Sequence, residues 1–93
     1  MIERHADCLR VTAPMVMDNA RGLLEAGRSA FSDNREVVDL GGVTEVDSSA
    51  LAVMLGWLRA AEGRGAQVVF ANLPASVRSL AELYGLTDLL PLA

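Results

Sequence analysis

The chain of 93 residues and 9.9 kDa is the size of one small domain, which excludes an enzyme with separate cofactor and substrate domains. Hydrophobic residues make up 52% of it, enough for one apolar core, and a single cysteine, Cys8, fits a reducing cytoplasm better than a secreted scaffold. The formal net charge is -4, and the 8 basic residues, all arginines, are scattered among 12 acidic ones, so we expect no nucleic-acid-binding face. No apolar run approaches the roughly 20 residues of a membrane-spanning helix, so any role at a membrane would come through a partner.

The first half of the chain predicts a strand, a helix and a second strand. Residues 8–12 alternate in polarity as a short strand does and end near Pro14, which cannot continue a sheet ladder. A helical repeat of apolar residues then runs from Pro14 to Phe31 and stops at the turn formers Ser32-Asp33-Asn34. Residues 36–40 contain a β-branched pair and precede two glycines, which predicts a central strand.

The second half predicts a helix, a strand and a further helix. The first of these helices begins at residues 48–49, where either serine can cap it, and ends at Gly63. Residues 67–71 predict a strand, Pro74 opens the last helix, and Gly85 closes it in a left-handed conformation. Strands that alternate with helices predict a single α/β domain over residues 1–93 with at least one parallel strand pair.

Catalytic residues are scarce in this sequence. The only histidine, His5, lies in an N-terminus that we expect to be frayed, which disfavours both a Ser-His-Asp triad and a histidine metal site. The glycines at Gly41-Gly42 and Gly63-Arg64-Gly65 match no phosphate-binding loop. We therefore predict no catalytic residues, no metal and no cofactor.

Two carboxylates, Asp39 and Asp47, lie at the two ends of one strand-to-helix connection, where a pair could do acid and base work. A solvated loop end explains Asp39 more simply, and it also explains Glu45 between them. For Asp47 two interpretations stay open, a charge at a helix terminus and a part of a functional loop. We count both aspartates as residues of a supporting loop.

Ser48 and Ser49 are the residues most typical of a functional site in this sequence. They place two hydroxyls on a turn into a helix, beside an acidic residue and in front of the unpaired N–H groups of the helix start. This arrangement suits a phosphate acceptor or a hydrogen-bonding site. Simple capping of the helix explains the same residues, and the two interpretations are compatible.

The helix that follows is apolar over a wider arc than one core face needs, because Ala50, Val53 and Trp57 extend its stripe sideways. Either these residues pack into a second buried layer, or Trp57 is an exposed anchor for a partner. Tyr84 is likewise open to two interpretations, a core aromatic with its hydroxyl at the surface and a partner contact.

Residues 37–51, VVDLGGVTEVDSSAL, resemble the signature of STAS domains, and residues 77–90 resemble that family's later helix and tail. The resemblance implies a single STAS-like domain, with a mixed sheet of about four to five strands and three helices packed against it. Two departures stand out: residues 13–16, Ala-Pro-Met-Val, replace the usual Gly-x-Leu-Asp, and Ala50 replaces the commoner glycine.

Two branches of this family give different functions. In anti-sigma-factor antagonists the hydroxyl that matches Ser48 is phosphorylated by a partner kinase. In the MlaB-like branch the subunit binds the cytoplasmic, MlaF-like ATPase of a phospholipid ABC transporter through the same surface, and the hydroxyl again matches Ser48. The short stretch of sequence after Leu-Tyr-Gly-Leu, residues 83–86, favours the MlaB-like branch.

The resemblance implies a non-enzymatic cytoplasmic protein that lies peripheral to the inner membrane through its ATPase partner, or alternatively binds an anti-sigma factor kinase. Either Ser48 or Ser49 would be the phosphorylated residue. The expected partner-binding residues are Ser48, Ser49, Ala50, Val53, Trp57 and Tyr84.

Overall fold

The computed structural model describes residues 1–32 and 34–93, so Asp33, in the turn expected at Ser32-Asp33-Asn34, lies outside the described residues. Four strands form one sheet in the order β1-β2-β3-β4, in which β1 and β2 are antiparallel and the other pairs are parallel. With three α-helices beside it, this sheet confirms the predicted fold class and the parallel pairing. The elements are β1 Ile2–Arg4, β2 Leu9–Val11, η1 Met17–Asn19, α1 Ala20–Ala30, β3 Arg35–Asp39, α2 Ser49–Gly63, β4 Gln67–Ala71, α3 Ala75–Leu83 and η2 Thr87–Leu89, where η marks a 3-10 helix.

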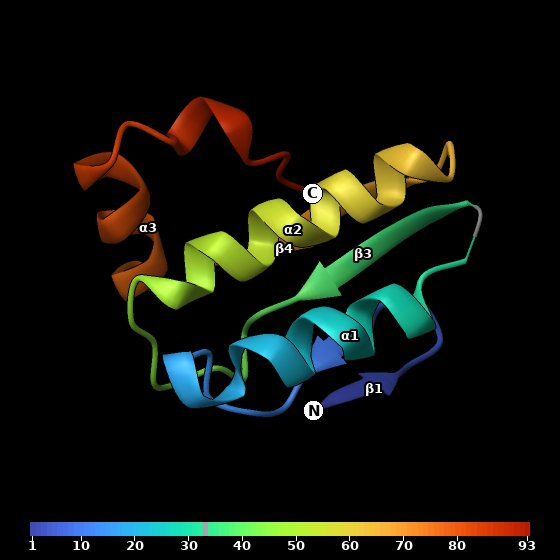
Figure 1. Cartoon of the computed structure of the whole chain (residues 1–93), viewed down its shortest axis with the longest axis horizontal. Helices are drawn as coiled ribbons and strands as arrows, with labels where there is room; N and C mark the ends of the chain where they lie inside the picture. Colours follow the sequence, from blue (N-terminus) through green and yellow to red (C-terminus); the bar gives the residue numbers. More distant parts are fainter. Residues whose placement is uncertain (33) are drawn as a thin grey trace.

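Helices α1 and α2 lie side by side on one face of the sheet, and α3 lies at one end of the molecule (Figure 1). The core forms between this helical layer and the sheet, because alternate strand residues point to the same face. Trp57 of α2 occupies its centre, with its ring edge-on to Phe31 and stacked near Phe70 of β4. No helix among the described residues is both long and apolar enough to cross a membrane.

The exposure expected for Trp57 and Val53 is wrong, because both side chains lie in the core. Trp57 is 0% exposed, Val53 2% and Ala50 0%, so the wide apolar arc of α2 belongs to a second buried layer. The physical reason lies in α1, where Gly27 leaves room for the indole ring and a Cβ at that position would overlap it. The indole N–H donates to the carbonyl oxygen of Leu23 at 3.0 Å, which satisfies the one polar atom of the buried ring.

The N-terminus is also not frayed as expected, since residues 2–4 form β1. A bidentate ion pair holds this strand: Arg4 donates to both carboxylate oxygens of Glu36, at 2.9 and 2.8 Å. Arg4 also donates to the carbonyl oxygen of Ala30 at 3.0 Å, which ties β1 to the end of α1. These contacts join residues 26 to 32 positions apart, so no local pattern could predict them.

The first α-helix begins later than its apolar repeat suggested. Pro14 does not open it; Met15 is fully buried and pairs with Val46, and regular helix starts only after the 3-10 turn of η1. At the other end of the chain Gly85 has a φ of 68°, which confirms the left-handed close of the last helix. Leu92 of the tail then bridges to Phe70 and extends the edge of the sheet.

Candidate functional site

The starts of the helices gather at one edge of the sheet. β2, β3 and β4 are parallel, and each is followed by a helix, so the three connections leave from the same carboxyl edge. Figure 1 shows the result: η1, the start of α2 and α3 lie along one end of the molecule. This end carries Ser48 and Ser49, which together with Asp47 we call the serine corner.

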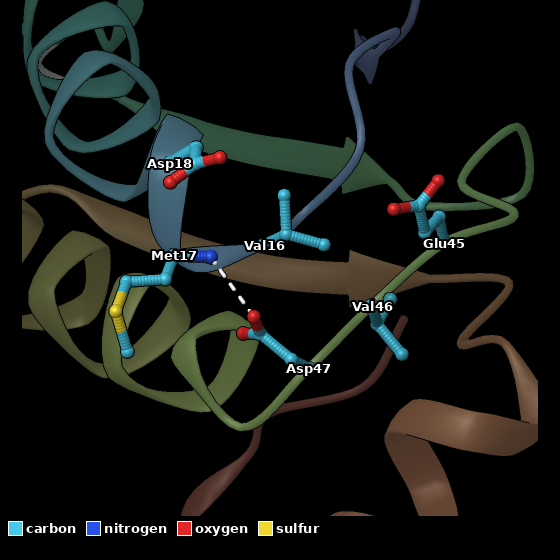
Figure 2. Close-up of a pocket in the computed structure, with 6 residues that line it drawn as sticks. All are labelled: Val16, Met17, Asp18, Glu45, Val46 and Asp47. Carbon is cyan, nitrogen blue, oxygen red and sulfur yellow. Dashed lines mark hydrogen bonds between the residues drawn. The ribbon is translucent and has the colours of Figure 1, made fainter.

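Asp47 joins two of these connections through its side chain. One carboxylate oxygen accepts the backbone N–H of Ser49 at 2.8 Å. The other accepts the backbone N–H of Met17 at 3.0 Å, the bond that Figure 2 marks. These bonds, from Met17 first and Ser49 second, hold the pKa of Asp47 below its usual value. Asp47 therefore caps the start of α2, as a charge at a helix terminus can, and it also fixes η1, while its part in a functional loop stays a prediction.

The backbone reinforces this junction. The N–H of Met15 donates to the carbonyl oxygen of Glu45 at 2.9 Å, and the N–H of Asp47 donates to that of Met15 at 3.1 Å. Together with the parallel bridge between Met15 and Val46, these bonds continue the sheet beyond its regular strands. The loop that carries the serines is therefore held in one position relative to η1.

The serines themselves do not cap α2 through their side chains, contrary to the sequence prediction. Ser48 occupies the N-cap position without a side-chain capping bond, because the N–H groups of Ala50 and Leu51 donate instead to the backbone carbonyl oxygens of Asp47 and Ser48. The side chain of Ser48 is exposed and that of Ser49 is half-buried. Ala50, which follows them, is buried and cannot contact a partner in this conformation.

A shallow pocket of about 350 Å³ lies beside this corner (Figure 2). Its wall combines acidic and apolar side chains from η1 and from the loop before α2, and contains no basic residue. Met17 is 73% exposed, one of the most exposed large apolar side chains of the described residues. The lining residues are Val16, Met17, Asp18, Glu45, Val46 and Asp47.

Asp39 is not the solvated loop end that we expected. Its side chain is only 15% exposed and accepts hydrogen bonds from the Gly41 N–H at 2.8 Å and the Asn72 amide at 3.1 Å. These two bonds, in that order, lower its pKa, and Arg10 lies 3.8 Å away. Asn72 has a φ of 55°, a conformation that asparagine tolerates better than most residues. Asp39 thus fixes the turns after β3 and β4.

Tyr84 is 55% exposed at the end of α3, so its interpretation as a core aromatic is wrong. Its neighbour Leu83 is 75% exposed, and both residues lie at the C-terminal end of α3. Sequence reasoning missed Leu83 and Met17, since their apolar character alone predicts burial. Among the described residues no group of three or more His, Cys, Asp or Glu side chains is placed to hold a metal ion.

Several solved structures share the fold of this chain. A candidate anti-sigma factor antagonist of Thermotoga maritima aligns with a TM-score of 0.77 at 16% identity, covering 99% of this chain and 83% of that one. An anti-sigma-factor antagonist (STAS) domain protein of Planctomyces limnophilus gives 0.71 at 12% identity, with coverages of 98% and 86%. The murine anion transporter Slc26a9 gives 0.72 at 16% identity, covering 92% of this chain and 15% of the transporter.

The family is shown more specifically by sequence. The family model described as "Mlab, STAS domain" matches residues 1–91, so the chain belongs to this STAS family. No curated protein matches the chain significantly. The resemblance read from residues 37–51 is therefore confirmed at the level of the family.

Proposed function

We propose that the chain is a non-enzymatic STAS subunit that binds and regulates the ATPase of a phospholipid-transporting, Mla-type ABC transporter. The observation that carries this proposal is the exposed Ser48 at the start of α2, in a chain whose residues 1–91 match the Mlab STAS family. Because Asp47 caps the helix, the Ser48 hydroxyl is available for a partner. The protein would lie in the cytoplasm, at the inner membrane through its partner.

We define the docking end as the end of the molecule that carries Met17, Ser48 and Ser49, at the starts of η1 and α2. Leu83 and Tyr84, at the C-terminal end of α3, are proposed as further partner contacts. Met17 and Leu83 would take the anchoring role that the sequence had suggested for Val53 and Trp57. Exposed aromatic and large apolar side chains are typical of the centre of protein interfaces. The buried Trp57 and Val53 support this surface from below, since they fix α2 against α1 and the sheet.

The charge of the docking end suggests what the partner presents. Asp18, Glu45 and Asp47 line the pocket beside Ser48, so a basic side chain on the partner would meet it favourably. Phosphorylation of Ser48 or Ser49 would add nearly two negative charges next to these carboxylates. Repulsion would then oppose the favourable placement of a phosphate at a helix start, and docking would be weakened or redirected.

A second function, that of an anti-sigma-factor antagonist switched by phosphorylation of Ser48, is favoured by one observation. The candidate antagonist of Thermotoga maritima aligns with 99% of this chain, so the two proteins share a fold over nearly the whole chain. Its partner would be an anti-sigma factor kinase rather than an ATPase of a transporter.

Purification of the tagged chain from its native cells separates the two functions. The proposal predicts recovery of an ABC ATPase together with its permease, identified by mass spectrometry, and no turnover by the chain alone. Recovery of a kinase-like anti-sigma factor without the ATPase would instead support the second function and contradict the first.

A further inference from the structure

A second pocket, also of about 350 Å³, lies between α1 and α2. It is separate from the docking end: Gly56 comes eight residues after Ser48, about 12 Å further along the helix axis. Figure 1 shows the two helices side by side on the face of the molecule where this pocket lies. We call it the arginine groove, and it is lined by Leu24, Arg28, Gly56, Arg59 and Ala60.

The floor of the groove is apolar, because the side chain of Leu24 on α1 packs directly over Gly56 on α2. A Cβ on Gly56 would overlap the Cδ1 atom of Leu24, so the leucine side chain occupies the space above the glycine. Leu24 and Ala60 remain only half-buried, which leaves apolar surface open on both helices. A small aliphatic group of another molecule can therefore find contact there.

The rim of the groove is cationic. Arg28 and Arg59 are its only charged lining residues, and both are exposed. In the described part of the chain neither takes part in a salt bridge, although Glu25 and Glu62 lie three residues away on the same helices. Two guanidinium groups thus flank one apolar pocket, and no carboxylate of residues 1–32 or 34–93 forms a salt bridge with either.

The other arginines with identified partners serve the fold. Arg4 binds Glu36, Arg10 lies 3.8 Å from Asp39, and Arg64 donates to the carbonyl oxygen of Phe31 at 2.8 Å. The groove is also opposite in sign to the pocket at the docking end, whose charged lining residues are all acidic. A molecule that fits the groove is thus different from one that fits the docking end.

We propose that the arginine groove is a second docking surface, which takes a protein segment that presents an Asp or Glu carboxylate beside an aliphatic side chain. A planar guanidinium binds a carboxylate through two parallel hydrogen bonds, and the aliphatic group covers Leu24, Gly56 and Ala60. A bilayer of anionic lipids fits less well, because the groove is concave and the chain carries a net charge of -4.

Site-specific photo-crosslinking in native cells identifies the segment. The crosslinker p-benzoylphenylalanine replaces Glu62, which is exposed one turn beyond Arg59, so that both arginines of the groove remain. The crosslinked peptide should contain an Asp or Glu next to an aliphatic residue. A crosslinked phospholipid, or no protein product at all, overturns the proposal.

Charge reversal then tests the pairing with the purified partner. R59E should weaken binding about 10-fold or more, and reversal of the partner's carboxylate to arginine should restore it with R59E but not with the wild type. R35E is the matched control, since Arg35 is exposed but lies outside both pockets, and it should bind within about twofold of the wild type.

Equal binding by R59E and R35E overturns the proposal, provided that circular dichroism shows both variants folded. So does loss, on R59E substitution, of binding to vesicles that contain phosphatidylglycerol, because the groove would then recognise a membrane. These outcomes do not depend on which partner the docking end binds, so this proposal and the proposed function can fail separately.

Discussion

Asp47 decides the local geometry of the serine corner, because its two oxygens hold η1 and the start of α2 at once. Replacing Asp47 with alanine removes both bonds and leaves the N–H groups of Met17 and Ser49 without this partner. We expect D47A to lower the midpoint of thermal unfolding by a few degrees, measured by circular dichroism.

Asp18 offers the matched control, since it is an acidic residue that lines the same pocket and lies in the first turn of η1. D18A removes the same charge and should leave the midpoint within a degree or so of the wild type. If D47A and D18A unfold at the same temperature, Asp47 does not organise this corner.

Glu36 is the residue through which acid should destabilise the protein. Its pKa is lowered from 4.5 to about 2, first by the hydrogen bonds from Arg4 and further by Ser32. Because the folded pKa lies below the unfolded one, Glu36 adds stability above pH 4.5, and this stability is lost as the pH falls toward 2. The contribution is at most about 3 kcal/mol, because half of the Arg4 side chain faces solvent.

Urea unfolding between pH 2 and pH 7 tests this. The wild type should lose stability steeply below pH 4.5, whereas E36Q should be less stable at pH 7 and show a flatter acid limb. Parallel pH profiles for the two proteins would show that the Arg4–Glu36 pair has no part in acid unfolding.

At the scale of elements, the contact between α1 and α2 depends on Gly27. A methyl group there gains up to about 1 kcal/mol of helix propensity but overlaps the ring of Trp57, and overpacking typically costs about 1–3 kcal/mol. The ring cannot easily move, since it is bonded to Leu23 and packed against Phe31. We therefore expect G27A to be destabilised in urea unfolding.

Gly63 is the matched glycine in the other helix. It ends α2, and nothing lies within 4 Å of a Cβ built there, so G63A should equal or exceed the wild type in stability. If G27A had the same free energy of unfolding as G63A, the close packing of Trp57 against Gly27 would not contribute to the stability of the core.

The elements differ in how far the sequence determines them. The strand expected at residues 67–71 matches β4 because an apolar run between turn formers is a local signal. By contrast, β1 depends on Arg4 reaching Glu36, and the burial of Trp57 depends on the missing side chain of Gly27, both distant in sequence. An apolar arc on a helix has the same period whether it faces a core or a partner, so only the structure separates these cases.

The candidate site was predictable to a similar extent. Residues 47–49 stand out locally, and the structure places them together at the start of α2. The bond from the Ser49 N–H to Asp47 joins residues two positions apart, whereas the bond from the Met17 N–H to Asp47 joins residues 30 positions apart, which the sequence does not reveal. The exposed anchors were missed because Met17 and Leu83 have the composition of core residues.

At the scale of the whole molecule, the protein is a two-layer domain with two pockets whose charged lining residues are opposite in sign. The docking end lies at the carboxyl edge of the parallel strands, and the arginine groove lies on the helical face. A small regulatory domain with two such surfaces can contact a partner assembly from two sides.

The most direct measurement is the affinity of the purified partner for two variants that each gain one negative charge. S48E places it on the docking end, and Q67E places it on an exposed residue at the start of β4, the opposite edge of the sheet. We predict that S48E binds at least about 10-fold more weakly than the wild type while Q67E binds within about twofold. Equal affinities for S48E, Q67E and the wild type would contradict the claim that partners dock at the serine corner.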